Sequence, residues 1–265
     1  RNCLFSLKKN DYPSFDIIVV DNGSSDCSLS MLKEQFPEVD VLEMGYNSGF
    51  CKANNVGIRY ALDNGSDSVI LLNNDTEVDH NFIKEMAEAI DVENKIGMIA
   101  AKVIFMGDKS LIDSAGLQIT PDGLAKNRGL LEDINNYDSI SEVFCPAGAA
   151  ALYTREVLED VEEKGQYLDE SFEYYFEELD LGWRARLCGW RCAYSPDAVV
   201  YHIKSATSGA YSEFVAYYTN RNNYYNIIKN YPFLNAVKAL ILAFLRYLFL
   251  SFGIILKKGA GDKIN

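Results

Sequence analysis

Two groups of amide and acidic side chains, far apart in the chain, could do chemistry together. The first follows an apolar run at residues 70–72, and the second lies between aromatic and basic residues. In open α/β sheets, ligands bind beyond the carboxyl ends of strands, where an acidic residue can hold a divalent cation. A carboxylate of the second group is suited to act as a general base. The residues are Asn73, Asn74 and Asp75 in the first group and Glu177, Glu178 and Asp180 in the second.

The transfer of a sugar from a nucleotide-sugar needs both a bound divalent cation and a general base. Departure of a nucleoside diphosphate leaves negative charge that a divalent cation offsets, and the incoming hydroxyl group needs a base. We therefore predict that Asp75 is a metal ligand and that a carboxylate of the second group is the base. The alternative for this segment is a turn followed by a helix cap at Thr76 or Asp79.

Further segments occur in an order that resembles glycosyltransferase family 2, the inverting enzymes with the GT-A fold. An apolar run at 17–20 leads into a polar turn that contains Gly23, and residues 47–57 form a small-residue loop that leads into a helix. Residues 167–190 carry the second acidic group. The resemblance covers roughly residues 3 to 230. It implies an α/β, Rossmann-like GT-A domain whose mostly parallel sheet is flanked by helices, with a C-terminal helical extension.

The resemblance also assigns roles to matching positions. Asp21 falls where the family contacts the nucleobase, and Asp75 takes the place of the last Asp in the family's Asp-x-Asp pattern. His202 follows an apolar strand, where the family's histidine reaches the metal or the diphosphate; an ordinary packed residue is the alternative. The implied metal is Mn²⁺ or Mg²⁺. The implied nucleotide-binding residues are Asp21, Lys52, Asn54, Asn73 and Asn74, and the implied metal ligands are Asp75 and His202.

The same resemblance places the catalytic base at Glu178, where the family more often has Asp. The longer side chain moves the carboxylate by roughly a bond length, and errors of about 1 Å can be costly in catalysis. Glu177 and Asp180 are therefore alternative bases. Both also precede arginines at helical spacing, so ion pairs within a helix are a second role for them.

The hydrophobic pattern predicts strands that alternate with helices, the rhythm of βαβ units. By resemblance, the small residues at 144–153 form the floor beneath donor sugar and acceptor; the alternative is a tightly packed strand. The polar stretch at 105–142 is interpreted as a variable excursion that shapes acceptor choice. Strands are expected near 16–21, 39–43, 68–73 and 98–104, and helices near 27–36, 50–63 and 80–91.

Composition favours one catalytic domain, at residues 1–230. The chain has 265 residues, 48% of them hydrophobic, which can bury one substantial core. A net charge of −13 argues against a nucleic-acid partner and suits an added divalent cation. Six cysteines lack the paired spacing of a disulfide framework or a zinc site, which indicates reduced thiols and a cytoplasmic location.

Residues 231–265 form an apolar segment that predicts a membrane-associating helix. A helix over 239–256 would be about 27 Å long, close to the bilayer's hydrocarbon thickness of about 30 Å. Arg246 at its centre would cost about 2.5–3.5 kcal/mol on insertion. We therefore favour a helix that lies on the cytoplasmic face of the inner membrane, with Lys238, Arg246 and the terminal lysines at the headgroups. The alternative is a helix that covers the domain or pairs with another copy.

Residues 1–7 resemble the family's first helix, so we expect that a central parallel strand precedes them in the intact protein. The chain as given should then bind nucleotide poorly and be less stable. The expected donor is a dTDP- or UDP-sugar, as in rhamnosyltransferase-like members of the family. The expected acceptor is a glycan or a polyprenyl-linked sugar of cell-surface polysaccharide synthesis.

Two other functions are compatible with an acidic α/β nucleotide domain. A sugar-phosphate nucleotidyltransferase also uses acidic metal ligands, but it does not explain the acidic and aromatic segment at 167–184. A non-catalytic protein that binds nucleotide-sugars would keep the fold. The released product discriminates these functions: nucleoside diphosphate for sugar transfer, pyrophosphate for nucleotidyl transfer, and neither for a binding protein.

Overall fold

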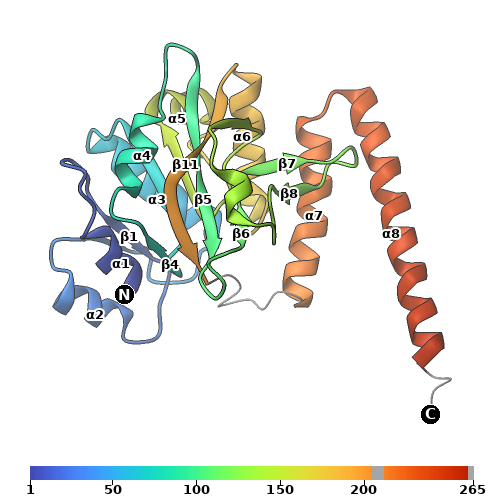
Figure 1. The fold of residues 1–265 in the computed structure, drawn as a ribbon, viewed down its shortest axis with the longest axis horizontal. Helices are drawn as coiled ribbons and strands as arrows, with labels where there is room; N and C mark the ends of the chain where they lie inside the picture. The colour runs from blue at the N-terminus through green and yellow to red at the C-terminus, as the bar shows by residue number, and fades with distance from the viewer. Residues whose placement is uncertain (204–211, 262–265) are drawn as a thin grey trace.

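The computed structural model describes residues 1–203 and 212–261, with side chains up to residue 249. A seven-stranded sheet forms its centre (Figure 1). Its strands are β3 (Ser68–Leu72), β4 (Thr76–Val78), β5 (Ile96–Phe105), β6 (Ile112–Ser114), β9 (Ser141–Val143), β10 (Ala150–Thr154) and β11 (Arg191–His202). The order across the sheet is β3-β10-β5-β11-β4, with β6 beside β5 and β9 beside β11.

The sheet is mixed, whereas the sequence analysis predicts a mostly parallel one. β5 and β11 run parallel, but β10 runs antiparallel to both of its neighbours, β3 and β5. A parallel neighbour requires a crossover connection, usually an α-helix. The chain between β5 and β10 instead contains short strands and the 3₁₀ helix η1 (Ile134–Tyr137), so β10 enters the sheet in the opposite direction.

The first part of the chain forms a second, two-stranded parallel sheet. β1 (Ile18–Asp21) and β2 (Asp40–Glu43) pair through their whole length and are joined by α2 (Ser28–Gln35). Leu4 of α1 (Asn2–Leu7), Leu32 of α2 and Phe36 pack together in one apolar cluster on this sheet. The strands expected near 16–21 and 39–43 and the helix expected near 27–36 are thereby confirmed.

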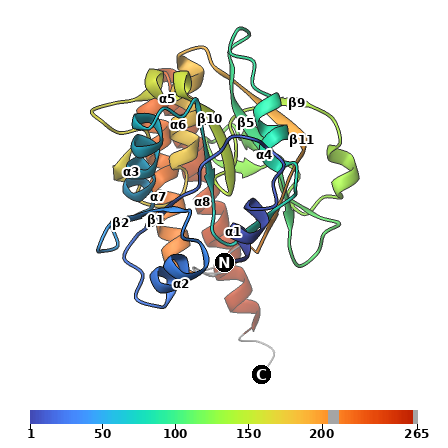
Figure 2. The same cartoon turned by 90° about the vertical axis from the view of Figure 1, so that its left-hand side faces the viewer.

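Helices cover both faces of the large sheet (Figure 2). Alternate residues of β5 point to opposite faces, because side chains alternate along a strand. Met98 and Ala100 pack in the cluster with residues of α3 and α5, while Ile99 and Ala101 pack in the cluster with residues of α4. The helices that position the site are α3 (Phe50–Asp63), α4 (Phe82–Glu88), α5 (Arg155–Val161) and α6 (Glu177–Leu187).

Two C-terminal helices, α7 (Glu213–Asn230) and α8 (Phe233–Gly261), stand beside this body (Figure 1). The hairpin of β7 (Leu117–Ile119) and β8 (Ala125–Asn127) reaches them, since a Cβ at Gly123 would lie 2.6 Å from the Ile227 side chain. α8 packs inward through the buried Ala239 and Ala243. None of the helices in the described ranges has the length and hydropathy needed to cross a bilayer.

Arg246 takes a different role from the headgroup contact that the sequence predicts. Its Nη1 lies 2.9 Å from Oδ2 of Asp122, at the turn of the β7–β8 hairpin. Apolar residues flank this arginine in α8, and the hairpin supplies its acidic partner. This ion pair ties α8 to the body. The division between residues 1–230 and 231–265 stays a prediction.

Candidate active site

The end of β1 lies against the loop that precedes α3. Asp21 is buried, and its Oδ2 accepts a hydrogen bond from the N–H of Ser24 at 3.3 Å. The Asn22 side chain donates to Oδ1 of Asn47 at 3.1 Å. Gly23 has φ 80°, and a Cβ there would come within 2.7 Å of the backbone nitrogen of Asn47. Only glycine therefore allows the two loops to approach this closely.

Two predicted nucleotide-binding residues lie in the first turns of α3. The Lys52 ammonium donates to the Tyr46 hydroxyl at 3.2 Å, which places it beside the same loop. The Asn54 amide donates to the Phe50 carbonyl at 2.9 Å, so this side chain is engaged within the helix. The structure thus gathers Asp21 and Lys52 around one loop.

Residues 73–75 follow β3, as predicted. The Asn73 carbonyl accepts a hydrogen bond from the Thr76 hydroxyl at 2.6 Å, while Asn74 is exposed. The alternative of a helix cap at Thr76 or Asp79 is wrong, because Thr76 begins strand β4 and the N-cap of α4 is Asn81. Asp75 is directed at His202, with 3.3 Å between Oδ1 and Nε2. The two predicted metal ligands therefore lie side by side.

His202 is held between two carboxylates at the end of β11. Its Nδ1 lies 2.8 Å from Oδ2 of Asp113, opposite the contact with Asp75. Burial alone would lower the imidazole pKa, but the hydrogen bonds to Asp113 and Asp75 outweigh burial and raise the pKa to about 9. The hydrogen bond from His202 in turn lowers the pKa of the Asp75 carboxyl. Without a metal, the ring is an imidazolium at neutral pH.

This arrangement fits a divalent cation that is shared with a diphosphate. Asp75 offers a hard oxygen and His202 an imidazole nitrogen, while Asp113 fixes the second ring nitrogen as outer-shell carboxylates commonly do. In the part of the chain that the structure describes, no three His, Cys, Asp or Glu side chains form a metal cage. A cation here would need substrate oxygens and water, which Mg²⁺ and Mn²⁺ commonly use.

Asp113 is a site residue that the sequence motifs do not indicate, and it lies in the stretch interpreted as a variable excursion. Its side chain is only 3% exposed and sits in β6, paired with β5. A buried carboxylate needs a partner, and His202 provides it. In the sequence, the sign of this role is an acidic residue directly after the apolar Ile112. That sign indicates a buried carboxylate only when the pairing of β6 with β5 is known.

Glu177 and Glu178 open α6, where the partial positive charge of the helix N-terminus favours carboxylates. The Oε2 atoms of both residues are shielded from solvent and have no hydrogen-bond partner among the described residues. Burial raises the pKa of both carboxyls, and the charge of Glu178 raises the pKa of Glu177 further. The two carboxyls therefore titrate as a pair, and burial favours the protonated form of that pair.

The segment at 144–153 contains the packed strand that one interpretation expects, while its role as a floor beneath donor sugar and acceptor stays a prediction. Residues 150–154 are the buried strand β10, which lies between β3 and β5 in the sheet. Gly148, just before it, faces the acid pair, since a Cβ there would lie 3.5 Å from Oε1 of Glu178. The packed strand and the close approach to the site are thus adjacent parts of one segment.

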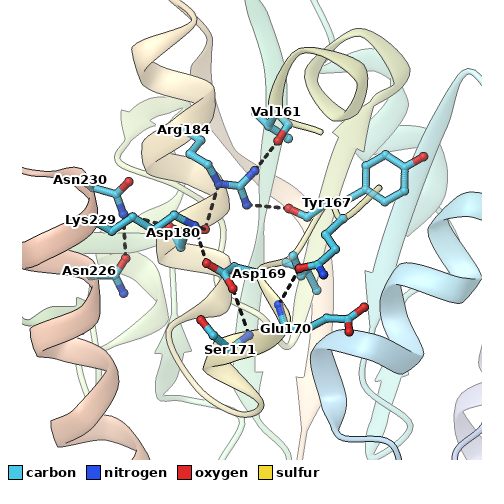
Figure 3. Close-up of polar contacts among 12 residues, drawn as sticks. Val161, Tyr167, Asp169, Glu170, Ser171, Asp180, Arg184, Asn226, Lys229 and Asn230 are labelled. Atoms are coloured by element: carbon cyan, nitrogen blue, oxygen red, sulfur yellow. Dashed lines mark hydrogen bonds and ion pairs between the residues drawn. The ribbon is translucent and has the colours of Figure 1, made fainter. Parts of the chain in front are cut away.

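Asp180 is completely buried one turn further along α6. Its Oδ2 accepts hydrogen bonds from Arg184 Nε at 2.9 Å and Lys229 Nζ at 3.0 Å, and its Oδ1 accepts one from Asn230 at 3.0 Å (Figure 3). Both oxygens face protein donors. This geometry agrees with the ion-pair role that the sequence analysis gives as an alternative for Asp180.

Residues 1–162 match the sequence model of a protein family described as Glycosyl transferase family 2. The chain belongs to glycosyl transferase family 2. The match covers Asp21 and Asp75 and ends before the acid pair of α6. The resemblance that the sequence motifs indicate is confirmed.

Two curated relatives of the family are similar to this chain. The low-salt glycan biosynthesis hexosyltransferase Agl10 of Haloferax volcanii is 30% identical over 174 residues, which cover 64% of this chain and 53% of the relative. The dTDP-rhamnosyl transferase RfbF of Shigella flexneri is 33% identical over 94 residues, which cover 36% of this chain and 31% of the relative. The chain thus spans about half or less of the length of these relatives.

A solved structure of GalNAc-T7 with UDP, GalNAc and Mn²⁺ has the same fold. Its TM-score is 0.59 at 16% identity, and the match covers 75% of this chain and 40% of that chain. The predicted GT-A fold of the α/β class is confirmed for this member of glycosyl transferase family 2.

Replacing Glu177 by Gln should stabilise the protein at neutral pH and flatten its pH dependence. The pKa of Glu177 is raised above the ordinary value of 4.5, so the folded state binds more protons than the unfolded state. The free energy of unfolding of the wild type therefore falls as pH rises from 4.5 through the folded-state pKa. Urea denaturation at a series of pH values measures this slope. An unchanged slope in Glu177→Gln would contradict the raised pKa of Glu177.

Asp113→Ala should lower the pKa of His202 below about 9, because one of the two hydrogen bonds that raise it is lost. Proton NMR titration of the metal-free protein measures this pKa. His80, the second of the two histidines, serves as an internal reference. Asp113→Asn keeps an acceptor without the charge and should give an intermediate value. A His202 pKa that stays at about 9 in Asp113→Ala would count against the role of Asp113.

Proposed function

We propose that the chain transfers a hexosyl group from a nucleotide-diphosphate sugar to a hydroxyl group, with inversion at the anomeric carbon and with dependence on a divalent metal. Membership of glycosyl transferase family 2 supports sugar transfer. The acid pair carries the mechanistic proposal, because its Oε2 atoms are shielded from solvent and lack partners among the described residues, at the start of α6 and beside Gly148.

In the proposed reaction, the carboxylate of Glu178 is the general base. It takes the proton of the acceptor hydroxyl while the hydroxyl oxygen forms a bond to the anomeric carbon. The bond from that carbon to the diphosphate breaks, and the nucleoside diphosphate leaves with the electron pair. A single displacement of this kind inverts the anomeric configuration. Burial raises the pKa of Glu178 above its ordinary value, which makes the carboxylate a stronger base.

Asp75 and His202 would hold Mn²⁺ or Mg²⁺ on the diphosphate side of the site. When bound, such a cation offsets the negative charge of the leaving diphosphate. Asp113 keeps the His202 ring oriented toward Asp75. The presence of Mn²⁺ with UDP in the structure of GalNAc-T7 supports a metal-dependent site on this fold.

We propose that the nucleotide lies against the loops around Asp21, which contacts the nucleobase. The dTDP in the name of the relative RfbF and the UDP in the structure of GalNAc-T7 support a dTDP- or UDP-sugar as donor. The residues proposed to bind the nucleotide are Asp21, Lys52, Asn54, Asn73 and Asn74.

The proposed acceptor is a glycan or a polyprenyl-linked sugar of cell-surface polysaccharide synthesis. The glycan biosynthesis in the name of the Haloferax volcanii relative supports an acceptor of this class. A lipid-linked acceptor places the protein at a membrane, and we propose the cytoplasmic face of the inner membrane.

The apolar surface of α8 supports a peripheral contact with that membrane. While Ala239 and Ala243 are buried, other apolar side chains of the helix are exposed. A helix with such a surface can lie in the headgroup region of a bilayer. The exposed apolar side chains of α8 are Phe233, Leu234, Val237, Ile241, Phe244, Leu245, Leu248 and Phe249.

Release of nucleoside diphosphate from a panel of dTDP-, UDP- and GDP-sugars, with Mn²⁺ and a polyprenyl-linked sugar, tests the proposed function. Glu178→Gln should lower the rate by about a hundredfold or more while nucleotide still binds, because the amide cannot accept the proton. Asp75→Ala should weaken metal-dependent donor binding. The exposed Glu163→Gln is the matched control and should leave the rate unchanged. Full turnover by Glu178→Gln would refute the assignment, and pyrophosphate as product would indicate nucleotidyl transfer.

Sedimentation with phosphatidylethanolamine and phosphatidylglycerol vesicles tests the membrane contact. Replacing Leu245 and Phe249 together by Ser should weaken binding at least about tenfold, because burial of each side chain contributes about 1.5–3 kcal/mol. Leu187→Ser is the matched control, since Leu187 is an exposed apolar residue on α6. Equal vesicle binding by the double variant and the control would contradict a contact through α8.

A further inference from the structure

The loop directly before the acid pair has a strained backbone. Glu173, Tyr175 and Phe176 have φ values of 60°, 67° and 67°, a region that residues with a side chain rarely adopt. Glu173 has ψ −59°, and the N–H of Tyr174 donates to the Phe172 carbonyl at 2.7 Å, which defines a γ-turn of the strained type. Such a conformation persists only when its surroundings over-determine it.

One support of this loop comes from α3. The Glu173 carbonyl accepts hydrogen bonds from the N–H groups of Phe50 at 3.1 Å and Cys51 at 3.3 Å. These N–H groups lie at the N-terminus of α3, where the helix itself offers them no acceptor. Tyr174 also donates its hydroxyl proton to Oδ1 of Asn47 at 3.2 Å. The strained loop is thereby attached to the loop beside Asp21.

The second support comes from the side chains of α7. The two amide protons of Asn222 are shared among three carbonyls, those of Phe172 at 2.9 Å and of Tyr174 and Tyr175 at 2.7 Å each. The Asn226 amide, one helical turn later, donates to the Phe176 carbonyl at 3.1 Å. Both asparagines are completely buried. Four carbonyls of five successive residues are thus bound by two side chains.

The same surface of α7 continues to the next turn of the helix, and Figure 3 shows Asn226, Lys229 and Asn230 on it. Lys229 donates to Asp169 at 2.6 Å and to Asp180 at 3.0 Å, on either side of the strained loop. We call this surface the α7 polar face: Asn222, Asn226, Lys229 and Asn230.

We infer that Asn222 and Asn226 are positioning residues for the base Glu178, a role that rests on the proposed function. The loop that they bind ends at Phe176, and Glu177 and Glu178 follow it with no residue between. A relaxed loop would rotate the first turn of α6 and move both carboxylates away from Gly148. The two asparagines bind the loop through its backbone carbonyls, so they position Glu178 from outside the substrate site.

Asn222→Asp and Asn226→Asp test this inference, because aspartate has nearly the shape of asparagine but cannot donate hydrogen bonds to carbonyls when ionised. We expect faster backbone hydrogen exchange at 172–176 in both variants. In the donor assay, kcat of Asn222→Asp should fall about tenfold to a hundredfold while the donor KM stays within about twofold, as expected for a misplaced base. Asn226→Asp loses one loop contact and should show a smaller fall.

Asn64→Asp is the matched control, since the exposed Asn64 amide also donates to a carbonyl, that of Tyr60 at 2.8 Å. It should change neither exchange at 172–176 nor kcat. Unchanged exchange in the folded α7 variants, or an unchanged kcat despite faster exchange, would overturn the inference. If Asn222→Asp fails to fold, the inference is tested with Asn226→Asp, by hydrogen exchange at 172–176 and by kcat in the donor assay. A wild type that turns over no donor would refute the proposed function, and the exchange result would still decide whether α7 holds the loop.

Discussion

The buried charge of Asp180 is the constraint on which the site depends. A carboxylate with no exposure is tolerated only when cations and hydrogen-bond donors surround it, and Arg184, Lys229 and Asn230 supply them. Arg184 belongs to α6, whereas Lys229 and Asn230 belong to α7, so the charge joins the two helices. Loss of one partner of a buried ion pair typically costs about 3–5 kcal/mol, which makes this junction hard to open. The remaining contacts of α7 with the strained loop follow from that junction.

The two sides of the site are positioned by different physical means. Sheet register places the metal side: His202 pairs with Thr76 across β11 and β4, and the N–H of Ile203 donates to the Asp75 carbonyl at 3.1 Å. Side-chain hydrogen bonds to backbone carbonyls place the base side, where three positive φ values cost about 1–3 kcal/mol each. Backbone pairing resists movement on the first side. On the second side, α7 offsets local strain.

Much of this arrangement could be predicted from the sequence, because apolar runs and polar turns mark the strands and their ends. Asp75 after β3 and the helix that follows Gly49 are examples. The direction of β10 and the contact of Asp113 with His202 could not, since both depend on the route of the chain between β5 and β10. The contact between α7 and the strained loop could not be predicted either. Every residue has a backbone carbonyl, so the loop sequence does not show that its carbonyls accept hydrogen bonds. The visible sign was amides at helical spacing, Asn222, Asn226 and Asn230, on a helix with apolar neighbours.

The central claim is a single displacement with Glu178 as base, and the anomeric configuration of the product tests it most directly. Proton NMR of the product formed from a donor of known configuration reports this outcome. The account predicts a glycosidic bond of opposite anomeric configuration to that of the donor, because one displacement inverts the reacting carbon. A product that retains the configuration of the donor would contradict the account.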